Sequence, residues 1–149
     1  MSDAYVHGHH DSVLRSHRWR TAENSAGYVL PYLQPGMRLL DVGCGPGTIT
    51  VDLAARVAPG TVIGVDQEPA VIAEAGQLLQ EHGSGNVRFK TADVYALGFD
   101  EESFDVVHAH QVLQHLTDPV AALVEMRRVL RPNGILALRD GDFGGFVWA

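Results

Sequence analysis

The sequence predicts an α/β fold, a three-layer α/β/α sandwich in which helices cover both faces of a mostly parallel sheet of about five strands. Short apolar runs alternate along the chain with stretches of helical periodicity, the pattern of parallel strands joined by crossover helices. Clusters of Pro and Gly separate these runs. The 149 residues, 46% hydrophobic and 19% charged, have the size and composition of one globular domain.

Five short apolar runs are expected to form buried strands. They are residues 38–42, 61–65, 87–91, 104–109 and 135–139. Runs of this length between turn residues suit strands that are covered on both faces of a sheet. Connections between parallel strands are right-handed, so the order of elements also predicts the handedness of the fold.

Three helices are expected between these strands. They span residues 48–57, 69–82 and 119–130. Pro69 suits the first turn of the second helix, and Gly83 suits its end. Asp118 or Thr117 is expected to cap the third helix. A turn at residues 132–134 then leads into the last strand.

The N-terminal part differs from this regular pattern. Residues 1–11 are polar, and their histidines His7, His9 and His10 have no second group of ligands nearby in the sequence. We therefore expect a solvated tail and no metal site. One or two short helices, broken near Pro31, are expected to follow, before a turn at Pro35.

The C-terminal residues 140–149 form an apolar stretch with no evident helix or strand. Beside an exposed sheet edge its apolar side chains would favour association. These side chains are those of Phe143, Phe146, Val147 and Trp148. We expect either a chain truncated at its C-terminus or one whose sheet edge is completed by a partner, such as a second copy in a homodimer.

Composition excludes several classes of function. Acidic residues outnumber basic ones, 18 to 11, and the net charge of −7 disfavours broad binding to nucleic acid or anionic lipid. No apolar run approaches the roughly 18 residues of a membrane-spanning helix. The single cysteine, Cys44, cannot form an internal disulfide, so we expect a cytoplasmic protein.

A glycine-rich loop is the most informative segment. Gly43, Gly45 and Gly47 follow the first predicted strand and open the first predicted helix, where glycines allow backbone to approach a ligand closely. The dinucleotide fingerprint G-x-G-x-x-G would need its last glycine at Thr48, and Pro46 removes one amide, so a pyrophosphate site is disfavoured. Taken alone, the loop could also be a tight strand-to-helix turn.

Carboxylates accompany the loop, one just before it and one at the end of each of the next two strands. Asp41 precedes it and could accept a hydrogen bond from an ammonium group or brace the loop. Asp66 ends the second strand, where a carboxylate can bind both ribose hydroxyls of a nucleoside. Asp93 ends the third strand and could face the amine of an adenine, with the Val94 amide at a ring nitrogen. Taken alone, Asp93 could equally be a turn aspartate.

With these motifs the sequence resembles the class I S-adenosylmethionine-dependent methyltransferases over residues 36–139. The matching segments are LLDVGCGPGT (39–48), VIGVD (62–66), TADV (91–94), FDVVHAHQVLQHL (104–116) and RVLRPNGIL (128–136). The resemblance is strongest to the small-molecule branch that includes quinone and sterol methyltransferases. It implies a Rossmann-like sheet with strand order 3-2-1-4-5. The family also has a C-terminal antiparallel hairpin beyond the fifth strand, which this chain lacks.

The resemblance implies a division of the chain and a set of ligand contacts. Residues 1–33 would form the tail and a helical lid, and residues 34–149 the S-adenosylmethionine-binding domain. The glycine loop would lie against the methionine moiety, His110 and Gln111 near the sulfonium, and Tyr28 in the lid. The implied cofactor-binding residues are Asp41, Gly43, Cys44, Gly45, Gly47, Asp66, Gln67, Asp93, Val94, His110, Gln111, Arg20 and Tyr28.

The chemistry implied is transfer of a methyl group from S-adenosylmethionine to a small-molecule acceptor by in-line displacement. The cofactor carries the activated group, and the protein positions the partners. If the acceptor must lose a proton, His110 and His115 are the candidate catalytic bases. His108, which alternates with His110, is interpreted as structural, and Cys44 as a small filler rather than a nucleophile.

Two other functions stay open at this stage. The chain could be a cofactor-binding fragment or subunit without catalysis of its own. It could also be an NAD-dependent oxidoreductase, which the loop spacing and Pro46 disfavour. The acceptor molecule and the atom that receives the methyl group are not specified by any motif.

Overall fold

A computed structural model describes residues 20–141. The strands are β1 (Arg38–Val42), β2 (Thr61–Asp66), β3 (Val87–Thr91), β4 (Phe104–His110) and β5 (Leu130–Arg139). The α-helices are α2 (Ala22–Ser25), α3 (Thr48–Val57), α4 (Pro69–His82) and α5 (Pro119–Val129), with short 3-10 helices η1 (Leu30–Tyr32) and η2 (Leu113–His115). The expected histidine-rich tail at residues 1–11 and the apolar stretch from residue 142 lie outside the described residues.

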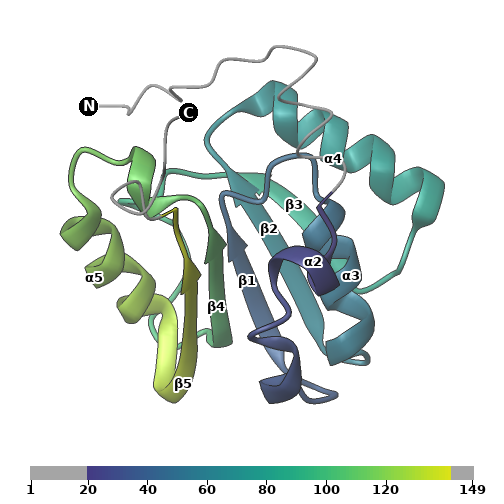
Figure 1. The fold of residues 1–149 in the computed structure, drawn as a ribbon, viewed down its shortest axis with the longest axis horizontal. Helices are drawn as coiled ribbons and strands as arrows, with labels where there is room; N and C mark the ends of the chain where they lie inside the picture. The colour runs from purple at the N-terminus through teal and green to yellow at the C-terminus, as the bar shows by residue number, and fades with distance from the viewer. Residues whose placement is uncertain (1–19, 142–149) are drawn as a thin grey trace, which may run out of the picture.

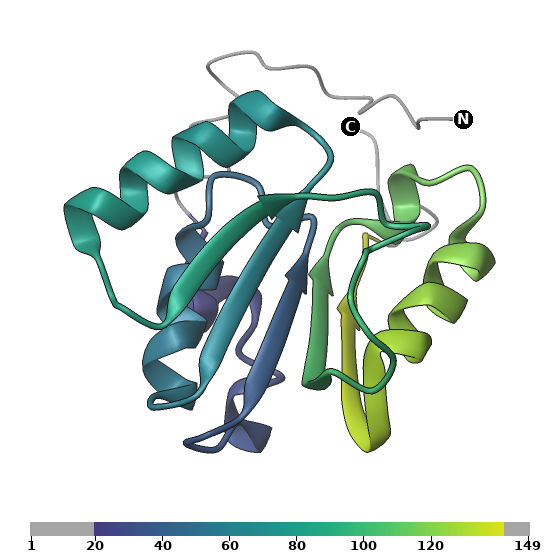
Figure 2. The same cartoon turned by 180° about the vertical axis from the view of Figure 1, so that it is seen from behind.

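The five strands form one sheet in the order β3-β2-β1-β4-β5 (Figure 1). Every neighbouring pair is parallel, which confirms the predicted fold class and strand order. The chain runs outward from β1 through β2 to β3, then returns to the other side of β1 for β4 and β5. The order therefore reverses between β1 and β4, and Figure 2 shows the same arrangement from behind.

Apolar side chains alternate between the two faces of the sheet, and each face has its own core. Leu39 of β1 and Val106 of β4 face a core that is closed by α2, α3 and the partly buried Leu79 of α4. Leu40 of β1 and Val107 of β4 face the opposite core, which is closed by α5 and the segment after β3. The sandwich thus follows from strands that are apolar on both faces.

Local signals place the helix ends where the sequence predicts them. Pro69 is the first residue of α4, and Gly83 is its C-cap. The Asp118 side chain caps α5, because its Oδ1 accepts a hydrogen bond of 3.0 Å from the backbone N–H of Ala121. Helices α3 and α4 have the predicted bounds.

Two expectations about local structure were wrong. Pro31 does not break a helix but lies inside η1, because proline is compatible with the first turn of a helix. The last strand begins at Leu130 rather than Ile135, since Leu130 pairs with Phe104 before a register shift lets Ile135 pair with Val106. The predicted turn at residues 132–134 therefore lies within the bounds of β5.

Among residues 20–141, no helix combines the length and the apolar character that a membrane span requires.

The core on the α3 side can be tested at Leu53. This side chain is fully buried, so Leu53→Ala should lower the free energy of unfolding by about 2–5 kcal/mol. Val124→Ala on α5 is the matched control, because Val124 is 64% exposed and should change it by less than about 0.5 kcal/mol. Urea denaturation of both variants measures the difference. Equal effects at the two positions would contradict the assigned core.

Candidate functional site

The structure brings the glycine loop, Asp66 and His110 to the carboxyl edge of the sheet. The glycine loop, residues 43–47, follows β1, Asp66 ends β2 and His110 ends β4. Parallel strands all end at one edge, and β1 and β4 are neighbours at the place where the strand order reverses. Open α/β sheets bind their ligands at this place.

The glycine loop depends on the absence of side chains. Gly43, Gly45 and Gly47 have φ values of +66°, +56° and +87°, in the left-handed region that other residues rarely adopt. A Cβ on Gly43 would lie 2.5 Å from a methyl group of Val112, and one on Gly47 would lie 2.6 Å from the ring of Phe89. The loop is therefore closely surrounded, and Gly43 and Gly47 have no space for a side chain.

Asp66 joins the loop to the end of β2. Its Oδ2 accepts a hydrogen bond of 3.1 Å from the Gly45 N–H, and its Oδ1 accepts one of 3.1 Å from the Glu68 N–H. The two amides fix the orientation of a half-buried carboxylate at the strand end. Gln67, between Asp66 and Glu68, is exposed beside it. A carboxylate has about four acceptor positions, so this arrangement suits a pair of hydroxyl donors.

Asp93 and Val94 lie beside the end of β2. They follow β3, and the Ala92 N–H before them donates a hydrogen bond of 3.0 Å to the backbone oxygen of Asp66. The exposed Asp93 side chain accepts a hydrogen bond of 2.9 Å from the Tyr95 N–H. Asp93 therefore stabilises a turn, and it does so beside Asp66.

Asp41 connects β1 to α3 and β4 on the core side of the loop. Its carboxylate is buried, with Oδ2 accepting a hydrogen bond of 2.7 Å from Thr50 Oγ1 and Oδ1 lying 2.8 Å from Nδ1 of His108. Of the two roles expected for Asp41, the structure shows the bracing contacts. His108 is fully buried, as its structural interpretation requires.

Cys44 lies inside the loop and is also buried. Burial raises the pKa of its thiol well above the usual value, and the negative charges of Asp41 and Asp66 raise it further. The thiol therefore stays protonated, which fits a filler better than a nucleophile.

Residues before β1 reach the site through two contacts. Arg20 Nη2 donates a hydrogen bond of 2.7 Å to Oε1 of Gln111, immediately after β4. Gln111 has a positive φ of 54°, and its N–H donates to the backbone oxygen of Arg139 at 2.6 Å. The Arg139 side chain in turn donates to the backbone oxygen of Ser25 in α2 at 3.2 Å. The segment around α2 is thus attached to the ends of β4 and β5.

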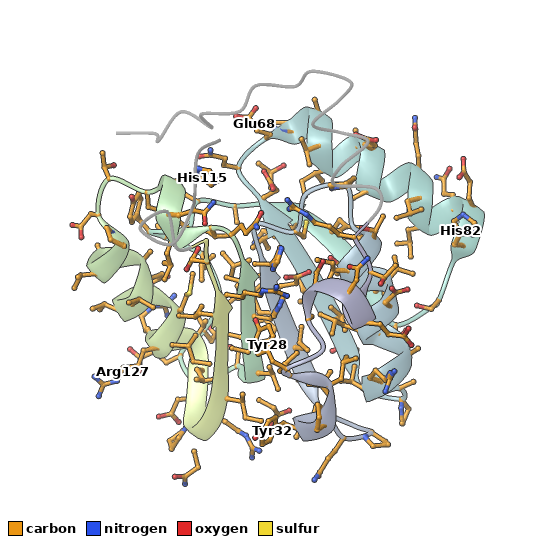
Figure 3. All side chains as sticks on the ribbon, in the orientation of Figure 1. Tyr28, Tyr32, Glu68, His82, His115 and Arg127 are labelled. Carbon is orange, nitrogen blue, oxygen red and sulfur yellow. The ribbon has the colours of Figure 1, made fainter. Side chains whose placement is uncertain are left out.

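Tyr28 belongs to the same segment and lies in front of the sheet (Figure 3). Its ring centroid is 6.2 Å from that of His108, and the residue is 40% exposed. Burial of part of the ring, followed by the charge of Asp41, raises the pKa of Tyr28 to about 12. The phenol is therefore neutral and can donate a hydrogen bond at physiological pH.

His110 is the last residue of β4, the strand between β1 and β5. Positive charges of Arg20 and Arg139 act on it. Burial, followed by the charge of Arg20, lowers the pKa of His110 to about 4. The imidazole is thus neutral at physiological pH. Its Nδ1 is buried and has no hydrogen-bond partner among the described residues.

His115, the other candidate base, lies in η2 at the same edge of the sheet. Figure 3 shows His115 and Glu68 at this edge, and Tyr32 at the opposite one. His115 Nε2 lies 3.2 Å from the side-chain nitrogen of Gln114.

Sequence reasoning missed two residues that contribute to the site, Thr50 and Arg139. Thr50 is a polar residue on the buried side of α3, and that mismatch with the apolar face was a signal that could have identified it. Arg139 ends β5 next to His110, a position that only the strand register reveals.

Comparisons with known proteins agree with this geometry. A family described as a methyltransferase domain matches residues 33–144. An uncharacterized methyltransferase of Schizosaccharomyces pombe is 40% identical over 144 residues, which are 93% of this chain and 52% of the relative. A ubiquinone/menaquinone biosynthesis C-methyltransferase of Idiomarina loihiensis is 39% identical over 66% of this chain and 40% of its own length.

Solved structures show the same fold. The YcgJ protein of Bacillus subtilis superposes with a TM-score of 0.74 at 30% identity, over 79% of this chain and 50% of its own. A SAM-dependent methyltransferase of Aquifex aeolicus superposes with a TM-score of 0.78 at 24% identity, over 87% and 71% of the two chains.

The chain spans about half the length of the two curated relatives, 52% and 40%. Within that half lie the glycine loop and the acidic strand ends, and the matching family covers all of them. The chain therefore belongs to the class I S-adenosylmethionine-dependent methyltransferase family.

Proposed function

We propose that the carboxyl edge of this sheet binds S-adenosylmethionine, and that the protein transfers its methyl group to a small-molecule acceptor. The observation that carries the proposal is the hydrogen bond between the Gly45 N–H and Asp66, which joins an open backbone loop to a fixed carboxylate. Family membership and the names of the relatives, which include quinone methyltransferases, support the same reading.

The residues at the edge fit this cofactor. The glycine loop would lie against the methionine moiety, and its glycines keep the positive φ values that shape it. Asp66 would accept hydrogen bonds from the ribose hydroxyls, with Gln67 beside the adenine. Asp93 and Val94, next to Asp66, would contact the adenine edge.

The lid residues complete the proposed site. Arg20 and Tyr28 would cover the methionine end, because Arg20 is bonded to Gln111 and Tyr28 lies against His108. In this proposal residues 1–33 form the tail and lid, and residues 34–149 the cofactor-binding domain. We place the protein in the reducing cytoplasm, because Cys44 is the only cysteine and is buried.

The chemical step asks the protein chiefly for positioning. S-adenosylmethionine supplies a methyl group already activated on a sulfonium, and displacement is in line with the departing sulfur. Holding the acceptor in line can supply roughly 7–11 kcal/mol of the barrier reduction. The lid residues and the β4 end would exclude water from this place.

His110 is the proposed base when the acceptor loses a proton. Its imidazole is neutral at physiological pH, so one of its two ring nitrogens has a lone pair that can accept a proton. The proton would pass from the acceptor's oxygen or nitrogen to the imidazole as the methyl group is transferred. His115, at the same edge, is the second candidate base.

Cofactor binding without catalysis is the second candidate function. The matched region covers only about half of the curated relatives, so acceptor contacts in those proteins can come from the other half. Within the described residues β5 pairs only with β4, and its other edge is where we propose that a further strand or a second copy adds.

The ribose assignment predicts the effect of Asp66→Ala. The variant should weaken binding of S-adenosylhomocysteine by about 1–3 kcal/mol, because hydroxyls and two backbone amides lose their acceptor. Calorimetric titration measures the change, and Glu81→Ala, at an exposed position on α4, is the control that should bind normally. Unchanged affinity in a folded Asp66→Ala variant would remove Asp66 from the site.

The environment of His110 predicts a pH dependence of stability. Its pKa falls from the ordinary 6.5 to about 4 on folding, so the unfolded chain binds a proton that the folded chain does not in this range. The free energy of unfolding should therefore decrease as the pH is lowered from about 6.5 to about 4. His110→Gln should show a shallower decrease in denaturant titrations at several pH values. An identical slope in both proteins would rule out the buried neutral imidazole.

A further inference from the structure

A buried polar chain lies directly beneath the glycine loop. His108 of β4 is the register partner of Asp41 of β1, and His108 Nδ1 lies 2.8 Å from Asp41 Oδ1. The two side chains are 0% and 4% exposed. Asp41 Oδ2 accepts the hydroxyl of Thr50, which is also fully buried. Since a carboxylate only accepts hydrogen bonds, Nδ1 of His108 carries the proton in this pair.

Burying the His108 imidazole costs folding stability compared with an apolar side chain at the same position. A buried pair of charged or polar groups can often be replaced by apolar residues of similar volume without loss of stability. The Nε2 atom of His108 is buried and has no hydrogen-bond partner among the described residues, which is a further disadvantage for stability. Packing alone therefore does not explain His108, and the benefit must come from the contact made by Nδ1.

The Asp41 carboxylate that His108 contacts is bonded at both ends of the loop. Asp41 lies in β1, just before the loop begins, and Thr50 lies in the first turn of α3, just after it ends. One carboxylate therefore joins the strand to the helix across residues 43–47. His108 fixes the orientation in which this carboxylate reaches Thr50, because it holds the other oxygen.

We propose that His108 is a positioning residue of the cofactor site. Through Asp41 and Thr50 it sets the shape of the loop against which the methionine moiety binds. This inference rests on the proposed function and adds a residue from β4 that would not touch the cofactor.

The test separates the Nδ1 contact from the filling of space. His108→Asn places an amide N–H near the position of Nδ1, whereas His108→Gln places it near Nε2, and His108→Leu fills the site without any donor. Calorimetric titration with S-adenosylhomocysteine gives the affinity of each variant, and circular dichroism with thermal melting reports whether each is folded. If His108 only filled the core, Leu and Gln would serve at least as well as Asn.

The expected order of affinity follows from the donor. His108→Asn should bind within about threefold of the parent, while the Gln and Leu variants should bind about tenfold or more weakly, since a hydrogen bond to a charged group is lost. Parent-like binding by folded Gln or Leu variants would overturn the inference. Failure of the parent chain itself to bind would instead refute the proposed function.

A second measurement is made on the parent chain, and a variant is needed only to assign the His108 resonances. Nitrogen-15 NMR of the parent chain should show His108 with its proton on Nδ1, and its ring resonances should shift when S-adenosylhomocysteine is added. The His108→Asn spectrum identifies the resonances by their loss. Ring resonances that stay unchanged at saturation would show that His108 is not coupled to the site, and would overturn the inference even if the Gln variant does not fold.

Discussion

The chain must turn from β1 into α3 within five residues, and this constraint governs the rest of the site. Three of those residues have positive φ values, and neighbouring side chains approach so closely that a Cβ on Gly43 or Gly47 would collide with them. The loop consequently presents backbone rather than side chains to the edge of the sheet. The loop lies between β1 and α3, at the reversal of strand order, which is where open α/β sheets bind their ligands.

Two carboxylates hold the loop, one inside the core and one near the surface. Asp41 joins its base to α3 and β4 inside the core, while Asp66 holds the Gly45 amide near the surface. Both carboxylates have protein partners on both oxygens, but Asp41 is buried, so it suits a structural task. The half-exposed Asp66 is oriented by amides and accessible from the edge, so it suits a ligand. This difference in burial gives Asp41 a structural role and makes Asp66 the candidate ligand contact, although the two aspartates look alike in the sequence.

Local chemistry explains which parts of the fold could be predicted from sequence. The strands are short apolar runs, and Pro69 and Gly83 delimit α4, so these elements need only nearby residues to be recognised. The strand order 3-2-1-4-5 came from family resemblance, since periodicity does not contain it. The start of β5 was missed because it depends on pairing with Phe104, a long-range contact. The link between Asp41 and His108 was missed for the same reason, as 67 positions separate them.

We propose that the carboxyl edge of this sheet recognises S-adenosylmethionine rather than a nicotinamide dinucleotide. Titration calorimetry of the 149-residue chain with S-adenosylhomocysteine, and with NADH in a parallel experiment, tests it most directly. We predict saturable binding of one S-adenosylhomocysteine per chain and no heat of binding with NADH. Binding of NADH, or saturation by neither compound in a folded chain, would contradict the account.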